Sequence, residues 1–364
     1  MTIQDVTNYL ESMAPLQYQE SYDNAGLIVG DDKNVVSGVL VCLDSTEEIV
    51  NEAIERKCNL IVAHHPIVFS GLKKITGKNY IERTVIKAIK NDVAIYAIHT
   101  NLDNMLNGVN EIIGRKLGLV NTHILSSTSN NLRKLITYVP VEHIDKVRES
   151  LFDSGAGKIG NYDECSFSSM GEGTFRAGDD TNAFIGEKGK RHLETEKKLE
   201  VIYSIDKQRG ILSALSNSHP YEVPAYDILE LQNSNSGIGA GLIGELKNGI
   251  DEITFLKFLK ITMKTDCVRY TDLQGRQIKK VAVCGGSGSF LLKDAIQQKA
   301  DVFITGDFKY HEFFDAENRI VIADVGHFES EQYTIELLVD KLKEKFTTFA
   351  VCFTEVNTNP VNYL

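Results

Sequence analysis

Two adjacent histidines, His64 and His65, are the residues of this sequence most suited to chemistry. They follow the apolar run Leu60–Ala63 and precede Pro66. A short apolar run that ends at a proline is typical of a buried strand, because proline cannot continue the hydrogen-bonded ladder. Open α/β sheets place their sites at such strand ends, and imidazole is the commonest ligand for zinc-like metals. Since neighbouring side chains on a strand diverge, the pair suits two metals, or one metal and its surroundings, better than one shared ion.

A second candidate lies near the end of the chain, where His327 and Glu331 are four residues apart. If a helix begins here, the two side chains share one face of it. One imidazole and one carboxylate at this spacing can bind a metal, and the carboxylate can bridge two. The alternative is ordinary helix chemistry, in which an acidic residue in the first turn complements the helix dipole.

An internal similarity connects these two candidates. Residues 39–65 match residues 281–307 without gaps, mostly at apolar positions, which favours two related βαβ lobes. The next strand of each lobe ends in a polar cluster, and aligning those strands brings Asp103 opposite His327. Two lobes packed face to face would bring four strand ends to one cleft.

The candidate metal ligands are therefore three imidazoles and two carboxylates: His64, His65, Asp103, His327 and Glu331. This set suits two divalent ions about 3.5–4 Å apart that share a water or hydroxide. Nitrogen-rich ligation favours zinc, with iron or manganese as alternatives.

The elements that must position these residues follow an α/β pattern. Expected strands at 36–43, 60–63 and 93–99 alternate with expected helices, which indicates a largely parallel sheet. Polar linkers at 126–131 and 232–237 enclose a different order, βαββαβ, typical of a ferredoxin-like fold. We therefore predict two lobes, 1–125 and 237–364, that form one metal-binding domain, interrupted by an inserted domain at 126–236.

The composition is that of a globular protein of 364 residues, 42% of them hydrophobic. A net charge of −11 argues against binding to nucleic acid, which needs a basic face. The six cysteines form no CxxC pair, and neither a signal pattern nor a membrane-length apolar run is present. We expect a reduced, cytoplasmic protein without membrane contact.

Several motifs together resemble a known family, the GTP cyclohydrolase I type 2 homologues, also called NIF-three-like proteins. The resemblance extends over essentially the whole chain. Its marks are the segments 22–27, 63–66, 99–103, 285–288 and 305–307, and Gly326-His327 with Glu331. Residues 219–227 are similar to the CutA/PII-like insertion of longer members.

The resemblance implies a two-metal centre on the five ligands named above and a ring-shaped homohexamer. The family name implies a small-molecule substrate, GTP, whose guanine imidazole ring is opened by a metal-activated hydroxide. The sequence departs from the family at one point. Members often carry paired histidines after Thr-Gly-Asp-x-x, whereas here Tyr310 precedes His311.

Further residues would complete this chemistry. His99 and His311 are candidates for the general acid that protonates the leaving nitrogen; the alternative for His99 is a structural role. Four residues in a glycine-rich turn could hold phosphate through backbone N–H groups, although a tight strand-to-helix turn would look the same; they are Gly285, Gly286, Ser287 and Gly288. Lys293 and Lys309 could assist with phosphate.

Two other functions are compatible with the same residues. One is a metal-dependent phosphoesterase or other hydrolase that uses the same hydroxide. The other is a non-catalytic, metal-stabilised hexamer whose PII-like insertion binds a regulator or partner. The chain contains no tryptophan to stack a purine, although its 14 tyrosines and 16 phenylalanines could do so.

Overall fold

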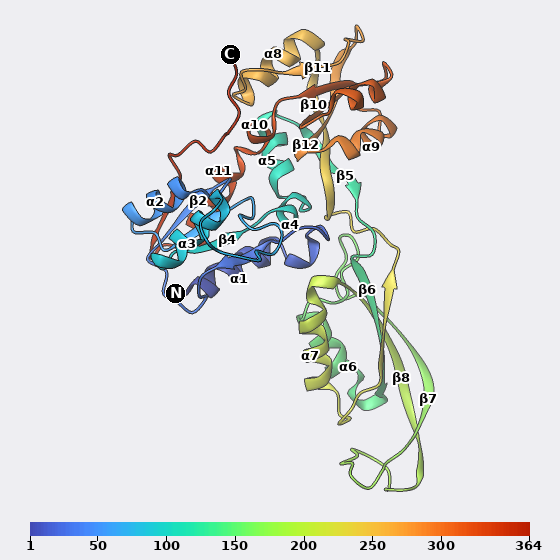
Figure 1. The fold of residues 1–364 in the computed structure, drawn as a ribbon. Helices are drawn as coiled ribbons and strands as arrows, with labels where there is room; N and C mark the ends of the chain where they lie inside the picture. The colour runs from blue at the N-terminus through green and yellow to red at the C-terminus, as the bar shows by residue number, and fades with distance from the viewer. The chain divides into compact units, whose positions relative to one another are not determined.

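The computed structural model describes residues 1–364, which divide into two compact units. Unit 1 contains Met1–Ser127 and Ser236–Leu364, and unit 2 contains Thr128–Asn235. Figure 1 shows unit 2 in green and yellow. Together they form a mixed α/β structure with three sheets.

The first sheet of unit 1 has five strands in the order β1-β4-β3-β2-β15. Strands β2, β3, β4 and β15 run parallel, and β1 pairs antiparallel with β4 at one edge. Their bounds are β1 Gly26–Val29, β2 Gly38–Cys42, β3 Leu60–Ala63, β4 Ala94–Ala97 and β15 Ala350–Phe353.

The second sheet of unit 1 has six strands in the order β11-β14-β13-β12-β10-β5. Strands β12, β13 and β14 run parallel, as β2, β3 and β4 do in the first sheet. The bounds are β5 Val120–Ser127, β10 Gly239–Asp251, β11 Arg269–Tyr270, β12 Gln277–Ser287, β13 Val302–Gly306 and β14 Val321–Asp324.

The core of unit 1 follows the two-residue period of its strands. Val39 and Val41 on β2 join a core that also contains Val281 and Val283 of β12, so this core connects the two sheets. The alternate residues Leu40 and Cys42 face a different cluster, which packs against α2 and α3.

The helices of unit 1 are α1 Ile3–Met13, α2 Glu47–Glu55, α3 Tyr80–Lys90, α4 Thr100–Asp103, α5 Val109–Lys116, α8 Glu252–Thr262, α9 Leu292–Gln297, α10 His327–Glu331 and α11 Thr334–Lys345. Three short 3₁₀ helices, η1 Leu16–Tyr18, η4 Ser289–Leu291 and η5 Tyr310–Ala316, complete the unit. No helix anywhere in the chain combines the length and apolar character needed to span a bilayer.

Unit 2 has one antiparallel sheet in the order β7-β8-β6-β9. Its elements in chain order are β6 Leu132–Pro140, η2 Val141–His143, α6 Ile144–Asp153, β7 Ser166–Arg176, β8 Arg191–Ser204, η3 Ile205–Lys207, α7 Gln208–Ser218 and β9 Tyr226–Leu231. Apolar residues of both helices pack with those of β6 and β8 in a separate core. Strands β7 and β8 form a long hairpin (Figure 1).

Replacing residues 131–232 by a short Gly-Ser link is expected to leave a soluble protein that still binds metal. The chain leaves and re-enters unit 1 through neighbouring strands, because Ser127 of β5 pairs with Gly239 of β10. The link therefore has little distance to span. Metal content and thermal unfolding, compared with the full chain, test this expectation. A soluble but metal-free product would show that unit 2 helps to build the centre.

Candidate metal centre

The candidate site lies where parallel strands of both sheets end. His64 and His65 follow β3, and His99 follows β4. From the second sheet, Asp307 follows β13, while His327 begins α10 shortly after β14. The carboxyl ends of parallel strands lie at one edge of a sheet. The two edges face each other here, since His327 Nε2 lies 3.4 Å from His65 Nε2.

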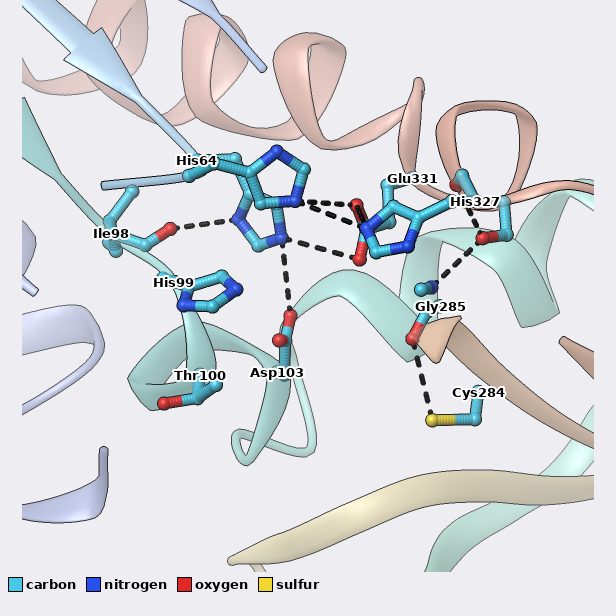
Figure 2. Close-up of polar contacts among 12 residues, drawn as sticks. His64, Ile98, His99, Thr100, Asp103, Cys284, Gly285, His327 and Glu331 are labelled. Atoms are coloured by element: carbon cyan, nitrogen blue, oxygen red, sulfur yellow. Dashed lines mark hydrogen bonds and ion pairs between the residues drawn. The ribbon is translucent and has the colours of Figure 1, made fainter. Parts of the chain in front are cut away.

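All five predicted metal ligands meet at this place. Figure 2 shows four of them, His64, Asp103, His327 and Glu331. Glu331 is only 3% exposed and connects the histidines. Its Oε1 lies 3.7 Å from His64 Nε2, and its Oε2 lies 3.0 Å from His65 Nε2 and 3.2 Å from His327 Nε2. Asp103 Oδ1 lies 3.6 Å from His64 Nε2. The i, i+4 spacing on α10 thus places His327 and Glu331 on the same face of the helix.

Each histidine of the centre is oriented through its Nδ1 atom. The Ile98 carbonyl oxygen lies 2.8 Å from Nδ1 of His64, which is fully buried. Carboxylates do the same for two others: Asp44 lies 2.9 Å from Nδ1 of His65, and Asp307 lies 2.7 Å from Nδ1 of His327. In all three, Nδ1–H donates to oxygen and Nε2 faces the centre. Metal-binding histidines in proteins have this arrangement.

The positions of the donor atoms suit metal coordination better than they suit hydrogen bonds among these residues. His64 Nε2, Asp103 Oδ1 and Glu331 Oε2 are buried and make no hydrogen bond of normal geometry. A buried polar atom without a partner is costly. Two ligands bonded to the same zinc ion at about 2.1 Å lie about 3.4 Å apart in tetrahedral geometry. The separations around Glu331 are close to this value, so these residues fit divalent metal ions.

The electrostatics of the centre also favour a bound cation. Burial lowers the pKa of His65 and His327, but their carboxylate partners outweigh burial and raise the values to about 10 and about 11. Burial, followed by the charge of Glu331, raises the pKa of Asp103 to about 7. Burial would also raise the pKa of Glu331, but the surrounding histidines lower it well below its usual value. The centre therefore favours added positive charge.

Metal binding at neutral pH is therefore expected to release about two to three protons per chain, because the bound ions displace them from His65, from His327 and, in part, from Asp103. The apparent metal affinity should rise with pH. Calorimetric titrations at one pH, in buffers of different ionisation enthalpy, count the protons released; a buffer-independent heat would contradict the expectation. In metal-free protein, the raised histidine pKa values stabilise the fold fully below about pH 6.5. That contribution is lost as the pH rises through 10 to 11.

His99 belongs to the same cluster, whereas His311 does not. The His99 ring centroid lies 5.3 Å from that of His64 and 5.4 Å from that of His65. Its Nδ1 lies 2.8 Å from Asp23 Oδ1. Burial raises the pKa of Asp23, but the hydrogen bonds from His99 and Thr100 outweigh it and lower the value to about 2. His311 is exposed on η5 in contact with the rings of Tyr310 and Phe314, and it does not line the cavity at the centre.

The predicted phosphate turn has a different geometry from the one expected. Strand β12 continues to Ser287, and three of the four amides already have partners within the protein. Gly285 N–H donates to Asn110, Gly286 N–H to Ser330, and Gly288 N–H to Thr305, each at 2.9 Å. These bonds argue against phosphate binding by Gly285–Gly288. Lys293 and Lys309 are exposed and do not line the cavity either.

Two of these glycines instead allow close packing, Gly286 against Glu331 and Gly285 against Val109. A Cβ atom on Gly286 would lie 2.3 Å from Glu331 Oε1, and φ at Gly286 is +65°. On Gly285 it would lie 2.8 Å from Val109. The glycine-rich sequence thus allows the backbone of β12 to approach the buried carboxylate.

Sequence reasoning missed the residues that orient the histidines. Asp44 follows the expected strand at 36–43, and Asp307 belongs to a motif that the internal alignment placed opposite His65, so both could have been found. Thr358 could not. Its hydroxyl donates to Asp44 Oδ2 at 2.9 Å from a tail far away in the sequence.

A cavity of about 1290 Å³ opens onto the centre. Exposed aromatic side chains lie around it, namely Tyr22, Phe69, Tyr80, Phe290 and Tyr363. Among the residues that line the cavity, Arg269 is the only lysine or arginine, and its side chain forms an ion pair with Asp324. The cavity can therefore accept a planar ligand, but it offers few positive side chains to an anionic one.

Comparisons with known proteins place these features in a family. The sequence model of Duf34/NIF3 (NGG1p interacting factor 3) matches residues 1–360. A Halalkalibacterium halodurans protein is 38% identical over 99% of this chain and 98% of its own length. A Staphylococcus epidermidis protein is 35% identical over the full length of both. Both are named GTP cyclohydrolase 1 type 2 homolog.

A solved structure resembles the whole chain. It is described as a Bacillus cereus protein related to NIF3, and it has a TM-score of 0.84 at 35% identity. The match covers 100% of this chain and 99% of the other.

Proposed function

This chain belongs to the Duf34/NIF3 family, and we propose that it is a hydrolase that uses two divalent metal ions held by His64, His65, Asp103, His327 and Glu331. One observation carries the proposal. Three buried donor atoms, His64 Nε2, Asp103 Oδ1 and Glu331 Oε2, have no hydrogen bond of normal geometry, while Nδ1 of each histidine ligand is held by an oxygen. This arrangement is unfavourable without a cation and is typical of a metal centre.

The residues divide into two groups that share Glu331. His65, His327 and Glu331 form one compact group of potential ligands. His64 lies beside the other oxygen of Glu331, and Asp103 lies beside His64. We propose zinc, with iron or manganese as alternatives, because nitrogen donors predominate.

When bound, two such ions would supply hydroxide at neutral pH and polarise the bond under attack. The protein's own contribution is orientation and proton transfer. His99 is held by Asp23, whose second oxygen accepts hydrogen bonds from the backbone and hydroxyl of Thr100. A histidine fixed in this way beside the ligands can donate a proton to a leaving nitrogen. We therefore retain His99 as the general acid and not His311.

The proposed reaction is the opening of the guanine imidazole ring of GTP, as the names of the relatives suggest. The aromatic side chains around the cavity support binding of a purine. The scarcity of positive side chains there means that the triphosphate would depend on the metal ions or on Arg269. The alternatives are a phosphoesterase that uses the same centre and a non-catalytic metal-stabilised assembly.

An incubation of metal-loaded protein with GTP distinguishes these functions. Loss of purine absorbance without phosphate release is the expected result, whereas phosphate release would identify a phosphoesterase. If neither change occurs and chelation only lowers the melting temperature, the centre is structural. A His99→Gln variant that binds metal normally but retains full activity would exclude His99 as the acid.

We also propose an architecture and an assembly for the protein. Two related lobes, 1–125 and 237–364, would form the metal-binding domain, and 126–236 would be a ferredoxin-like, CutA/PII-like insertion. Three parallel strands follow the same order in both sheets of unit 1, β4-β3-β2 in the first and β14-β13-β12 in the second, which supports two related lobes. The βαββαβ order of unit 2 supports the insertion. We further propose that the protein is a cytoplasmic homohexamer. Light scattering tests the assembly by measuring its mass in solution.

A further inference from the structure

Unit 2 contains a cavity of about 640 Å³ that the proposed metal chemistry does not use. It lies between the β7–β8 hairpin and two loops, 177–190 and 219–225. The loops contact each other, because the backbone N–H of Asn182 donates to Glu222 Oε2 at 3.0 Å. The volume is in the range of small-molecule sites, about 300–1,000 Å³.

A buried carboxylate without a cationic partner lines this cavity. Glu196 of β8 is 8% exposed and accepts a hydrogen bond from the Tyr221 hydroxyl at 2.7 Å through Oε1. No lysine or arginine forms an ion pair with it: Lys198 pairs with Glu200, and Arg176 is exposed. Burying an uncompensated carboxylate is unfavourable. The free energy of this site therefore improves if a cation enters.

The second oxygen of Glu196 is left available by a glycine. A Cβ atom on Gly173 would lie 2.2 Å from Glu196 Oε2, so only glycine gives the carboxylate this position. Oε2 has no hydrogen-bond donor within the protein, and Tyr221 donates to the other oxygen. Burial and the neighbouring carboxylate raise the pKa of Tyr221, so its hydroxyl remains a donor.

Aromatic rings form the walls around this carboxylate. The Tyr221 ring centroid lies 6.0 Å from that of Phe175 and 6.3 Å from that of Phe184. Both phenylalanines line the cavity, and Phe184 is 53% exposed. Aromatic faces attract organic cations and also pack against apolar groups.

We propose that this cavity binds a small organic ammonium ion, which donates N–H to Glu196 Oε2 and places its apolar part against Phe175 and Phe184. A bare metal ion is disfavoured. Of the three carboxylates that line the cavity only Glu196 is buried, since Glu172 and Glu222 are exposed, and one buried carboxylate with one tyrosine hydroxyl provides too few oxygen ligands for calcium or magnesium. A neutral ligand would leave the charge of Glu196 unmatched. The proposal does not depend on the function of the metal centre.

Calorimetric titration of the full chain with benzylammonium tests the proposal, and benzyl alcohol serves as the neutral probe of similar shape. One saturable site per chain is expected for the amine. The alcohol, and the amine with Glu196→Gln, should bind at least about tenfold more weakly, since a hydrogen bond between two charged groups is lost. Glu230→Gln is the matched control, because that exposed carboxylate of β9 pairs with Arg133 and does not line the cavity, so its loss should leave binding unchanged.

Two further variants keep the result unambiguous. Glu331→Gln should leave amine binding unchanged, which separates this site from amine coordination at the metal centre. Gly173→Ala should weaken binding as Glu196→Gln does, by displacing the carboxylate, and serves if Glu196→Gln fails to fold. Equal binding of amine and alcohol, binding that survives Glu196→Gln, or the absence of saturable binding would each overturn the proposal.

Discussion

The Glu331→Gln variant is expected to lose most of its metal while keeping its fold. Glu331 is the one side chain that lies beside all three predicted histidine ligands, through both of its oxygens. Glutamine has the same shape but is neutral, and its NH₂ group cannot bind a cation. Metal content should fall from about two ions per chain to one or none, and any hydrolytic activity should fall about 100-fold or more.

Metal analysis, circular dichroism and thermal unfolding of the variant test this expectation. Glu336→Gln is the matched control, because Glu336 lies on the neighbouring helix α11, where its carboxylate pairs with Lys116 at the surface. That variant should keep its metal and its activity. Full metal occupancy in Glu331→Gln would remove Glu331 from the ligand set and, with it, the observation on which the proposed function depends.

The Gly286→Ala variant is expected to distort the same centre, because the added methyl group on β12 would displace the Glu331 carboxylate. An alanine here would hold its Cβ 2.3 Å from Glu331 Oε1, so the carboxylate must move away from the histidines. The φ of +65° adds strain, which for an L residue costs about 1–2 kcal/mol. We expect reduced metal content together with a lower free energy of unfolding.

Gly71→Ala is the control for this second experiment. No atom lies within 4 Å of a Cβ placed at Gly71, so the added methyl group meets nothing there. Denaturant unfolding and metal analysis of the two alanine variants separate a loss of the centre from a general effect of replacing glycine. Normal metal content in Gly286→Ala would show that β12 does not set the position of Glu331. The glycine-rich turn would then need another explanation.

The sequence by itself determined the local part of this description. The apolar run before Pro66 predicted a strand that ends at His64 and His65, and β3 ends at Ala63. The i, i+4 spacing predicted that His327 and Glu331 share a helix face, and they do so on α10. These inferences succeed because strand and helix periods act between residues close in the chain. The resemblance to the NIF-three-like family, drawn from motifs, is confirmed by the family match.

The tertiary structure alone decided which groups complete the centre. Thr358 reaches Asp44 across more than 300 positions of sequence, and His311 turned out to lie outside the cavity. Gly286 proved to accommodate Glu331, and the amides of Gly285, Gly286 and Gly288 proved to be bonded to Asn110, Ser330 and Thr305. Such contacts depend on how two sheets pack and where a terminal tail lies. The periodicity of a single strand or helix does not predict such contacts, because the residues involved are distant in sequence and become neighbours only when the core forms.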